Sequence, residues 1–185
     1  NRVIVPLSKI PENIRNAVVA IEDKRYYDHM GIDVKALLRA AYVDATTGRI
    51  VEGGSTITQQ YVKNAYTGDE QTLSRKFREA VLAYQLEQTL SKDEILAKYL
   101  NTVYFGNGAY GIQAAAETYF GRAASDLTLA QAALLAGLIA APANYDPVVR
   151  PNLATTRRNQ VLTQMRELGM IEPGAFASAV QRPIN

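Results

Sequence analysis

Residues 128–142 read Thr-Leu-Ala-Gln-Ala-Ala-Leu-Leu-Ala-Gly-Leu-Ile-Ala-Ala-Pro. Thr128 and Gln131 have the spacing of a capping box, in which each side chain bonds the backbone N–H of the other residue at the start of a helix. We therefore predict an apolar helix that begins after Thr128 and ends at Pro142, because proline cannot continue a helix. A helix this apolar is typical of the core of a helical domain.

The segments on either side also carry helical signals. Ser91-Lys92-Asp93-Glu94 is a second capping box and predicts a helix that runs to about Asn101. Residues 152–168 predict a long helix closed by Gly169, and a short segment follows Pro173. Ser74 begins an amphipathic pattern whose apolar positions are predicted to face the core, namely Phe77, Val81, Tyr84 and Leu86.

The N-terminal part of the chain continues this pattern. Ser8 is predicted to cap a first helix, and Asp33 a second one that stops near Gly48. The residues expected to face inward are Ile14, Ala17, Val18 and Ile21 in the first helix, and Val34, Leu37, Leu38 and Ala41 in the second. Residues 48–54 and 65–72 are expected to be connections, with a short helix after Ser55-Thr56. Strand-like stretches are confined to 3–7 and 102–105, so the predicted class is mainly α.

The composition fits one folded domain. Of 185 residues, 48% are hydrophobic and 21% are charged, which is ordinary for a globular protein and excludes a disordered chain. The lack of cysteine excludes disulfides and thiolate metal sites. The net charge of +2 is too small for a nucleic-acid-binding footprint. No apolar run reaches the roughly 18 residues of a membrane span, and the chain opens on Asn1, so we expect an excised domain of a longer protein.

Two patterns that suggest other sites are weak. Residues 106–111 fit the G-x-G-x-x-G pattern of dinucleotide-binding proteins, but they follow a predicted helix rather than a buried strand. A tight turn that needs positive φ is the better interpretation. His29 is the only histidine, so it cannot form a zinc site by itself, and no nucleophile elbow accompanies it.

The run Glu-Asp-Lys-Arg-Tyr-Tyr-Asp-His-Met-Gly at residues 22–31 holds the first candidate catalytic group. Glu22 lies near the predicted C-terminal end of the first helix and next to Asp23. The helix dipole, the neighbouring like charge and partial burial all disfavour the ionised carboxylate, which makes Glu22 a better general base. The alternative is a solvated, charged helix end with surface ion pairs.

Two further clusters suit an anionic sugar substrate. Residues 53–60, Gly-Gly-Ser-Thr-Ile-Thr-Gln-Gln, combine a backbone open to close approach with hydroxyls, amides and a helix N-terminus. Residues 75–79, Arg-Lys-Phe-Arg-Glu, place three cations around one carboxylate and could bind a pyrophosphate. The alternatives are a capped helix after a loop, and a solvated basic face in which Glu79 pairs with Arg75.

Together with residues 92–101 and 108–121, these clusters resemble in order and spacing the peptidoglycan glycosyltransferases of glycosyltransferase family 51. These are the transglycosylase domains of class A penicillin-binding proteins and their monofunctional relatives. The resemblance covers residues from about 5 to 182. It implies a single domain over residues 1–185, with a lysozyme-like helical head lobe and a smaller, membrane-facing jaw lobe at roughly residues 32–65.

The resemblance also assigns roles to residues. Glu22 matches the general base of the family and Glu79 its second essential carboxylate, while Tyr26, His29 and Gly31 match the structural frame of the first motif. The residues that match substrate contacts are Asp23, Ser55, Thr56, Gln59, Gln60, Lys63, Asn64, Arg75, Lys76 and Arg78. Gln71 is a departure, because relatives often carry an arginine there that contacts phosphate.

The implied reaction polymerises lipid II with inversion and releases undecaprenyl pyrophosphate. The implied partners are lipid II, the growing glycan strand and a membrane surface. The residues expected to touch lipid are Leu37, Leu38, Ile50 and Val51, and the alternative is that they belong to the core. The implied location is the extracytoplasmic face of the bacterial cytoplasmic membrane, with a flanking membrane anchor in the full-length protein. No cofactor is required as far as the sequence shows, although a divalent cation, Mg²⁺ or Mn²⁺, could assist departure of the pyrophosphate.

Two other functions are kept as alternatives. A lysozyme-like muramidase or lytic transglycosylase would share the fold class and a catalytic glutamate. Such an enzyme needs no pyrophosphate site, so the cations at Lys63 and at residues 75–78 argue against it. The second alternative is a non-catalytic module that binds glycan or lipid.

Overall fold

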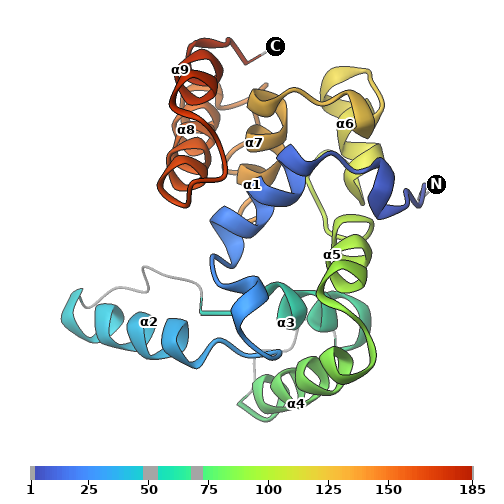
Figure 1. Ribbon diagram of the computed structural model, residues 1–185, viewed down its shortest axis with the longest axis vertical. Helices are drawn as coiled ribbons and strands as arrows, with labels where there is room; N and C mark the ends of the chain where they lie inside the picture. The colour runs from blue at the N-terminus through green and yellow to red at the C-terminus, as the bar shows by residue number, and fades with distance from the viewer. Residues whose placement is uncertain (1–2, 48–53, 68–72, 185) are drawn as a thin grey trace. The chain divides into compact units, whose positions relative to one another are not determined.

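A computed structural model describes residues 3–47, 54–67 and 73–184 (Figure 1). The chain divides into two compact units, one formed by Asn1–Ile21 with Leu100–Asn185 and the other by Glu22–Tyr99. Within the described ranges, β pairing is limited to two isolated bridges, Met30 with Ile32 and Tyr104 with Tyr110. The predicted mainly α class is confirmed, and the stretches 3–7 and 102–105 form no strand.

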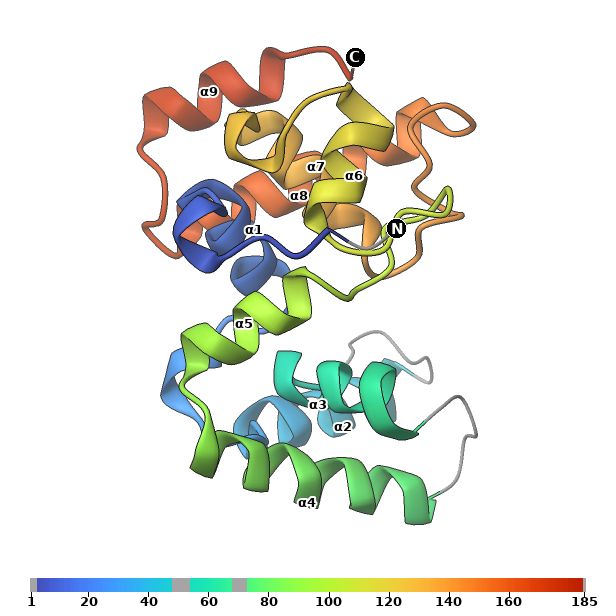
Figure 2. The same ribbon diagram turned by 90° about the vertical axis from the view of Figure 1, so that its right-hand side faces the viewer.

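The first unit is built around helix α7, Leu129–Leu138. It also contains most of α1 (Glu12–Glu22), together with α6 (Ile112–Phe120), α8 (Pro151–Glu167) and α9 (Pro173–Gln181). The predicted capping box of Thr128 and Gln131 is present, and α7 is almost wholly buried against α8 and α9 (Figure 2). The helix ends at Leu138 instead of at Pro142, because a turn intervenes at residues 139–140.

The glycine-rich segment before α6 is a tight turn. Gly106, Asn107, Gly108 and Gly111 all have positive φ, from 48° to 95°. The Phe105 N–H donates to the Ala109 carbonyl at 2.9 Å and closes the loop. This geometry confirms the interpretation as a turn, since a dinucleotide site would need a strand before the glycines.

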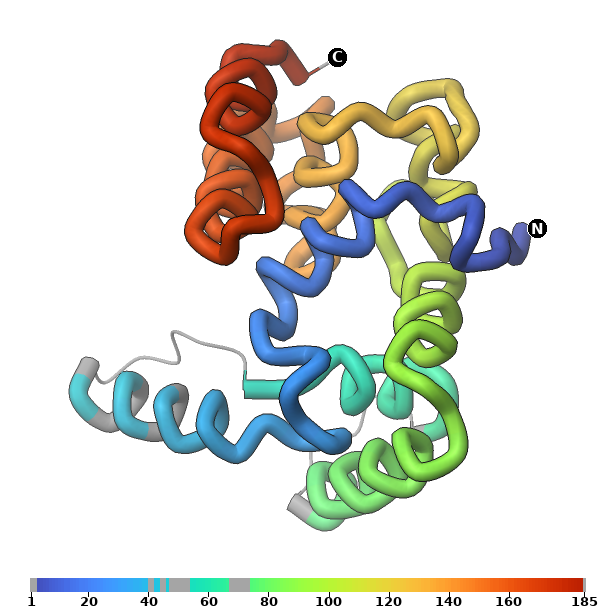
Figure 3. The backbone as a smooth tube through the Cα atoms, viewed as in Figure 1, coloured from blue at the N-terminus to red at the C-terminus, as the bar shows by residue number. Residues whose placement is uncertain are grey.

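The second unit contains α2 (Val34–Thr47), α3 (Ile57–Val62), a π-helical turn (Lys63–Thr67), α4 (Leu73–Thr89) and α5 (Lys92–Leu100). Helix α3 packs against α4 (Figure 2), and α2 runs away from both of them (Figure 3). The predicted caps are present, because the Asp33 carboxylate accepts from the Ala36 N–H at 3.0 Å. Ser91 and Glu94 likewise exchange hydrogen bonds at the start of α5.

The predicted start of the first helix is wrong. Ser8 lies inside a short 3-10 turn, Leu7–Lys9, and α1 begins at Glu12 after Pro11. Proline has no N–H to satisfy and a φ suited to a helix start, so it ends the turn and precedes the helix. Ile14, Ala17 and Val18 are buried as predicted, whereas Ile21 is half-buried.

The predicted inward faces of the second helix and of the helix after Ser74 are also wrong. The residues concerned are exposed, namely Val34, Leu37 and Leu38 in α2, and Phe77, Val81 and Tyr84 in α4. Leu86, also predicted to face the core, is half-buried. Helix α4 instead buries Arg75, Glu79 and Ala83. Periodicity identifies an apolar face but not what covers it. Ala41, Ile50, Val51 and Gln71 fall outside the side chains that the structure describes.

Candidate active site

Glu22, the last residue of α1, is held by an amide from α3. The Gln60 Nε2 donates to Glu22 Oε2 at 2.9 Å, and the Tyr99 hydroxyl donates to Gln60 Oε1 at 2.7 Å. Tyr99 is fully buried near the end of α5, and burial, followed by the charges of Glu22 and Asp23, raises its pKa well above 10.0. A chain of two hydrogen bonds therefore links Glu22 at the end of α1 to α3 and, through Gln60, to α5.

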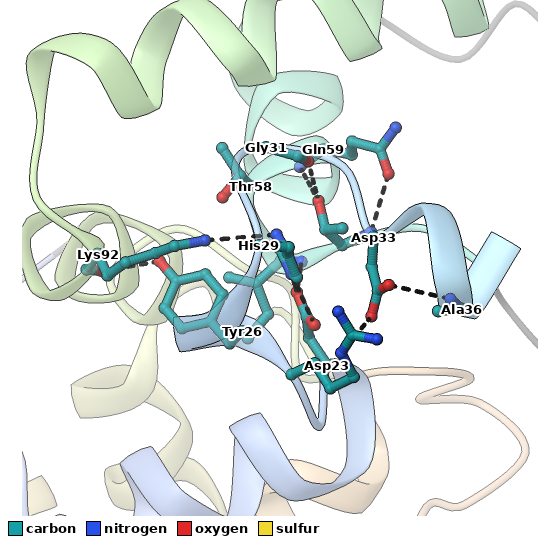
Figure 4. A network of polar contacts seen from close by, with 12 residues as sticks. Asp23, Tyr26, His29, Gly31, Asp33, Ala36, Thr58, Gln59 and Lys92 are labelled. Atoms are coloured by element: carbon teal, nitrogen blue, oxygen red, sulfur yellow. Dashed lines mark hydrogen bonds and ion pairs between the residues drawn. The ribbon is translucent and has the colours of Figure 1, made fainter.

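Asp23, which follows Glu22 in the chain, forms a buried pair with His29 (Figure 4). His29 Nε2 lies 2.9 Å and 3.0 Å from the two carboxylate oxygens of Asp23, and His29 Nδ1 lies 3.4 Å from Lys92 Nζ. Because an ammonium group can only donate, Nδ1 accepts and Nε2 carries the proton that Asp23 accepts. The backbone N–H of Ile57 also donates to Asp23, at 3.1 Å, which ties the first motif to the start of α3.

A third carboxylate, Glu87 on α4, contacts several buried polar groups of this unit. Its side chain is only 2% exposed and lies 2.8 Å from Lys92 Nζ. It also accepts from the Gly31 N–H at 2.6 Å and from the Thr58 hydroxyl. A buried carboxylate is stable only when donors of this kind replace its water. Glu87 therefore connects the first motif to α3 and α5.

Tyr26 completes this interior. Its hydroxyl donates to the Lys92 carbonyl at 2.7 Å, and Lys92 Nζ lies 4.5 Å from the centre of its ring. Burial, and then the charge of Glu87, raise the pKa of the phenol well above its ordinary value. Tyr26 therefore stays protonated and acts as a donor that fixes the start of α5.

Thr56 and Gln59 are used in building the start of α3. Thr56 accepts from the Gln59 N–H at 3.1 Å, and the Gln59 side chain accepts from the Thr56 N–H at 2.9 Å. The Thr56 hydroxyl also donates to the Gly31 carbonyl at 2.6 Å. Gly31 has φ +69°, and a Cβ there would lie 2.6 Å from the Tyr84 backbone nitrogen. These contacts fix the backbone at Gly31 and at the start of α3.

The cations of α4 surround a buried carboxylate. Glu79 is 1% exposed. Its oxygens lie 3.4 Å from Arg75 Nη1 and 3.8 Å from Lys76 Nζ. Lys76 also donates to the Ser55 hydroxyl at 2.8 Å. Arg75 is buried, whereas the side chain of Lys76 is 53% exposed and can reach a ligand. The pair of Glu79 with Arg75 that the alternative interpretation predicted is present, but both residues are buried, so the pair does not lie on a solvated face.

The remaining predicted contact residues are Arg78 on α4 and Lys63 and Asn64 after α3. Arg78 is exposed, and its Nε donates to the Ser74 carbonyl at 3.4 Å. Lys63 and Asn64 begin the π-helical turn directly after α3 and are half-buried and exposed, respectively. Lys63 therefore follows the Gln60 end of α3, whereas Ser55 precedes the other end.

Asp23, His29 and Asp33 offer ligand atoms within 4.8 Å of one another, which is a spacing that a metal ion could use. Both carboxylates already accept from protein donors. Asp23 accepts from His29 and Ile57, and Asp33 accepts from Ala36 and lies 3.6 Å from Arg25 Nε. The cluster is therefore a hydrogen-bonded frame with its own counter-cation.

Sequence reasoning did not identify Glu87, and it gave no individual role to Thr58, which lies in the predicted cluster at residues 53–60, or to Lys92 and Tyr99. Glu87 contacts Gly31 across 56 residues, and Tyr99 contacts Gln60 across 39. Lys92 was noted in a capping box and, with Tyr99, in the motif at residues 92–101. Contacts this distant leave no local pattern, although a glutamate on the inward face of α4 is a signal that could have been followed.

Comparison with known proteins identifies the family. A family model described as "Transglycosylase" matches residues 1–166. A penicillin-binding protein 1A from Aquifex aeolicus is 50% identical over 183 residues, which cover 99% of this chain and 25% of that protein. The penicillin-binding protein 1A of Pseudomonas aeruginosa is 45% identical over 184 residues, which cover 100% of this chain and 22% of that protein. The chain thus spans about a quarter of the length of these relatives.

A solved structure supports the fold independently. The crystal structure of penicillin-binding protein 1A from Haemophilus influenzae aligns with a TM-score of 0.62 at 24% identity, over 100% of this chain and 18% of that chain. At this identity the likeness concerns the fold. Within the ranges that the structure describes, no helix combines the length and apolar character needed to cross a bilayer.

Proposed function

This chain belongs to the transglycosylase family and is a peptidoglycan glycosyltransferase domain, and from that premise we propose that it polymerises lipid II into glycan strands with inversion at the anomeric carbon. One observation carries the proposal. Glu22 contacts Gln60 near the end of α3, and the cation cluster contacts Ser55, just before the start of the same helix. A six-residue helix is about 9 Å long, so base and cations lie within reach of one substrate.

Glu22 is the general base in this proposal. The acceptor sugar attacks through a hydroxyl, whose proton must be removed as the new bond forms. Attack from the face opposite to the leaving group inverts the anomeric centre, as in inverting glycosidases. The amide of Gln60 stabilises the carboxylate form that accepts the proton.

Glu79 and its cations assist departure of the pyrophosphate. A pyrophosphate is a good leaving group that needs charge neutralisation more than a proton. Lys76 is exposed enough to reach its oxygens, while Glu79 holds Lys76 and Arg75 in one cluster. Lys63, one residue beyond α3, can supply a further positive charge. A divalent cation bound with the pyrophosphate would add to this neutralisation.

The membrane surface is the partner proposed for α2. The exposed apolar positions of this helix are Val34, Leu37, Leu38 and Tyr42, which are 52–71% exposed. They follow the spacing of one helical face. An apolar face of this kind can lie in the interface of a bilayer that also carries the lipid-linked substrate. The full-length protein is accordingly proposed to act at the extracytoplasmic face of the cytoplasmic membrane.

Incubation with labelled lipid II, with and without Mg²⁺ or Mn²⁺, tests the reaction class. A polymerase produces long glycan and releases undecaprenyl pyrophosphate, and it leaves preformed glycan intact. A lysozyme-like hydrolase cleaves preformed glycan and does not polymerise lipid II. Cleavage without polymer formation would overturn the proposal in favour of the hydrolase, and loss of both activities would favour a binding module.

A further inference from the structure

The buried phenol of Tyr99 lies behind the proposed base, although no reaction step uses it. Its hydroxyl donates to Gln60 Oε1 at 2.7 Å, and Gln60 Nε2 donates to Glu22 Oε2 at 2.9 Å. We propose that Tyr99 is a positioning residue for the glycosyl transfer, which fixes the amide of Gln60 so that its NH₂ group faces Glu22. This inference rests on the proposed function, in which Glu22 accepts the proton of the sugar.

The chemistry of the three groups allows only one productive orientation of the amide. A carboxylate accepts hydrogen bonds and cannot donate them, so the NH₂ end of Gln60 must face Glu22. The carbonyl end then faces Tyr99 and requires a donor there. Burial and the nearby carboxylates raise the pKa of Tyr99, so its hydroxyl keeps its proton and supplies that donor.

Without the hydroxyl, the carbonyl oxygen of Gln60 loses its donor, and only the hydrogen bond to Glu22 still fixes the amide. An amide that turns toward another donor for this oxygen would weaken or break its hydrogen bond to Glu22. The charged form of Glu22 would then lose a hydrogen bond, and its pKa would rise. A base with a raised pKa is protonated over a wider range of acidic pH, so activity would be lost earlier as the pH falls.

Tyr99→Phe tests the inference, because it removes the hydroxyl and keeps the ring that fills the core. In the full-length protein acting on lipid II, we expect kcat to fall about 10-fold and KM to change less than about twofold. The acidic limb of the pH profile of kcat/KM should move up by about one pH unit. Tyr119→Phe is the control, since it removes a tyrosine hydroxyl bonded to the Phe105 carbonyl at 2.9 Å, and it should not move that limb.

A double-mutant cycle shows whether Tyr99 acts through Gln60. Gln60→Leu alone should move the acidic limb in the same direction, and adding Tyr99→Phe should then have no further effect beyond about twofold. Equal losses in both backgrounds, or a Tyr99→Phe profile that keeps the wild-type limb, would overturn the inference. If wild-type protein makes no polymer, or Glu22→Gln retains full activity, the proposed function itself fails.

A measurement without the Tyr99 variant covers the case in which that variant does not fold. The side-chain amide resonances of Gln60 in the wild-type protein should titrate at the pH of the acidic limb, and this titration should vanish in Glu22→Gln. If these amide resonances do not change with pH in the wild type, Gln60 does not contact the ionising base. The inference would then be wrong, because it requires that contact.

Discussion

Replacing Glu87 by glutamine should destabilise the second unit strongly, although the two side chains have nearly the same shape. The carboxylate is 2% exposed and accepts from Lys92, Thr58 and the Gly31 N–H. Glutamine keeps one acceptor oxygen and directs an NH₂ group at the remaining donors. Lys92, whose side chain is 18% exposed, would also lose its counter-charge.

The size of the effect follows from these contacts. Removing one partner of a buried ion pair costs about 3–5 kcal/mol. Because the glutamine oxygen still accepts one bond, we expect the lower end of that range, about 3 kcal/mol. For a unit of this size, such a loss lowers the unfolding temperature by roughly 10 °C or more.

Urea and thermal unfolding, followed by circular dichroism, measure this loss. Glu117→Gln is the matched control, because Glu117 is exposed and accepts from Gln113 on its own helix, and it should change the free energy of unfolding by less than about 0.5 kcal/mol. A Glu87→Gln loss of under about 1 kcal/mol would show that the carboxylate does not organise this interior as described.

Three further predictions concern other parts of the chain. In thermal unfolding, Gly31→Ala should lower the free energy of unfolding by several kcal/mol, and Gly169→Ala by only about 1 kcal/mol. Both glycines have φ near +69°, but only at Gly31 would a Cβ clash with backbone atoms. Equal losses in the two variants would contradict this packing. The pKa of Glu94 is lowered from 4.5 by hydrogen bonds from Ser91, so the stability that Glu94 contributes is present above that pH and is lost as the pH falls through the lowered value. Ser91→Ala removes the hydroxyl donor but keeps the backbone N–H donor, which is the larger cause, so an NMR titration should show that the pKa of Glu94 rises only part of the way toward 4.5. An unchanged pKa would show that the Ser91 hydroxyl does not lower it. Lys76→Met should raise KM for lipid II about 10-fold without changing the unfolding temperature, since this lysine is half exposed; an unchanged KM would exclude it from substrate binding.

The sequence predicts those parts of the fold that depend on neighbours along the chain. The predictions of the caps are correct because each cap is formed by residues within one stretch of four. They are the capping boxes at Thr128 and Ser91 and the cap at Asp33. The turn at Gly106 is predicted correctly because the need for positive φ depends only on the residues of the turn itself.

The errors and omissions come from contacts across the chain. Phe77 and Leu37 form apolar faces that were assigned to a core, yet both are exposed. The inward face of α4 is polar because Glu79 and Glu87 are satisfied there by donors from the same helix and from remote segments, respectively. The residues around Glu22 were predicted by resemblance, whereas the way Tyr99 supports them becomes visible only in three dimensions.

The general-base role of Glu22 is tested most directly by the rate of lipid II polymerisation in Glu22→Gln. Glu12→Gln, a substitution at the opposite end of the same helix, serves as the control for stability and charge. We predict that Glu22→Gln keeps its fold and loses polymerisation by at least about 100-fold, while Glu12→Gln polymerises like the wild type. A folded Glu22→Gln protein that forms glycan at the wild-type rate would contradict the assignment of the base.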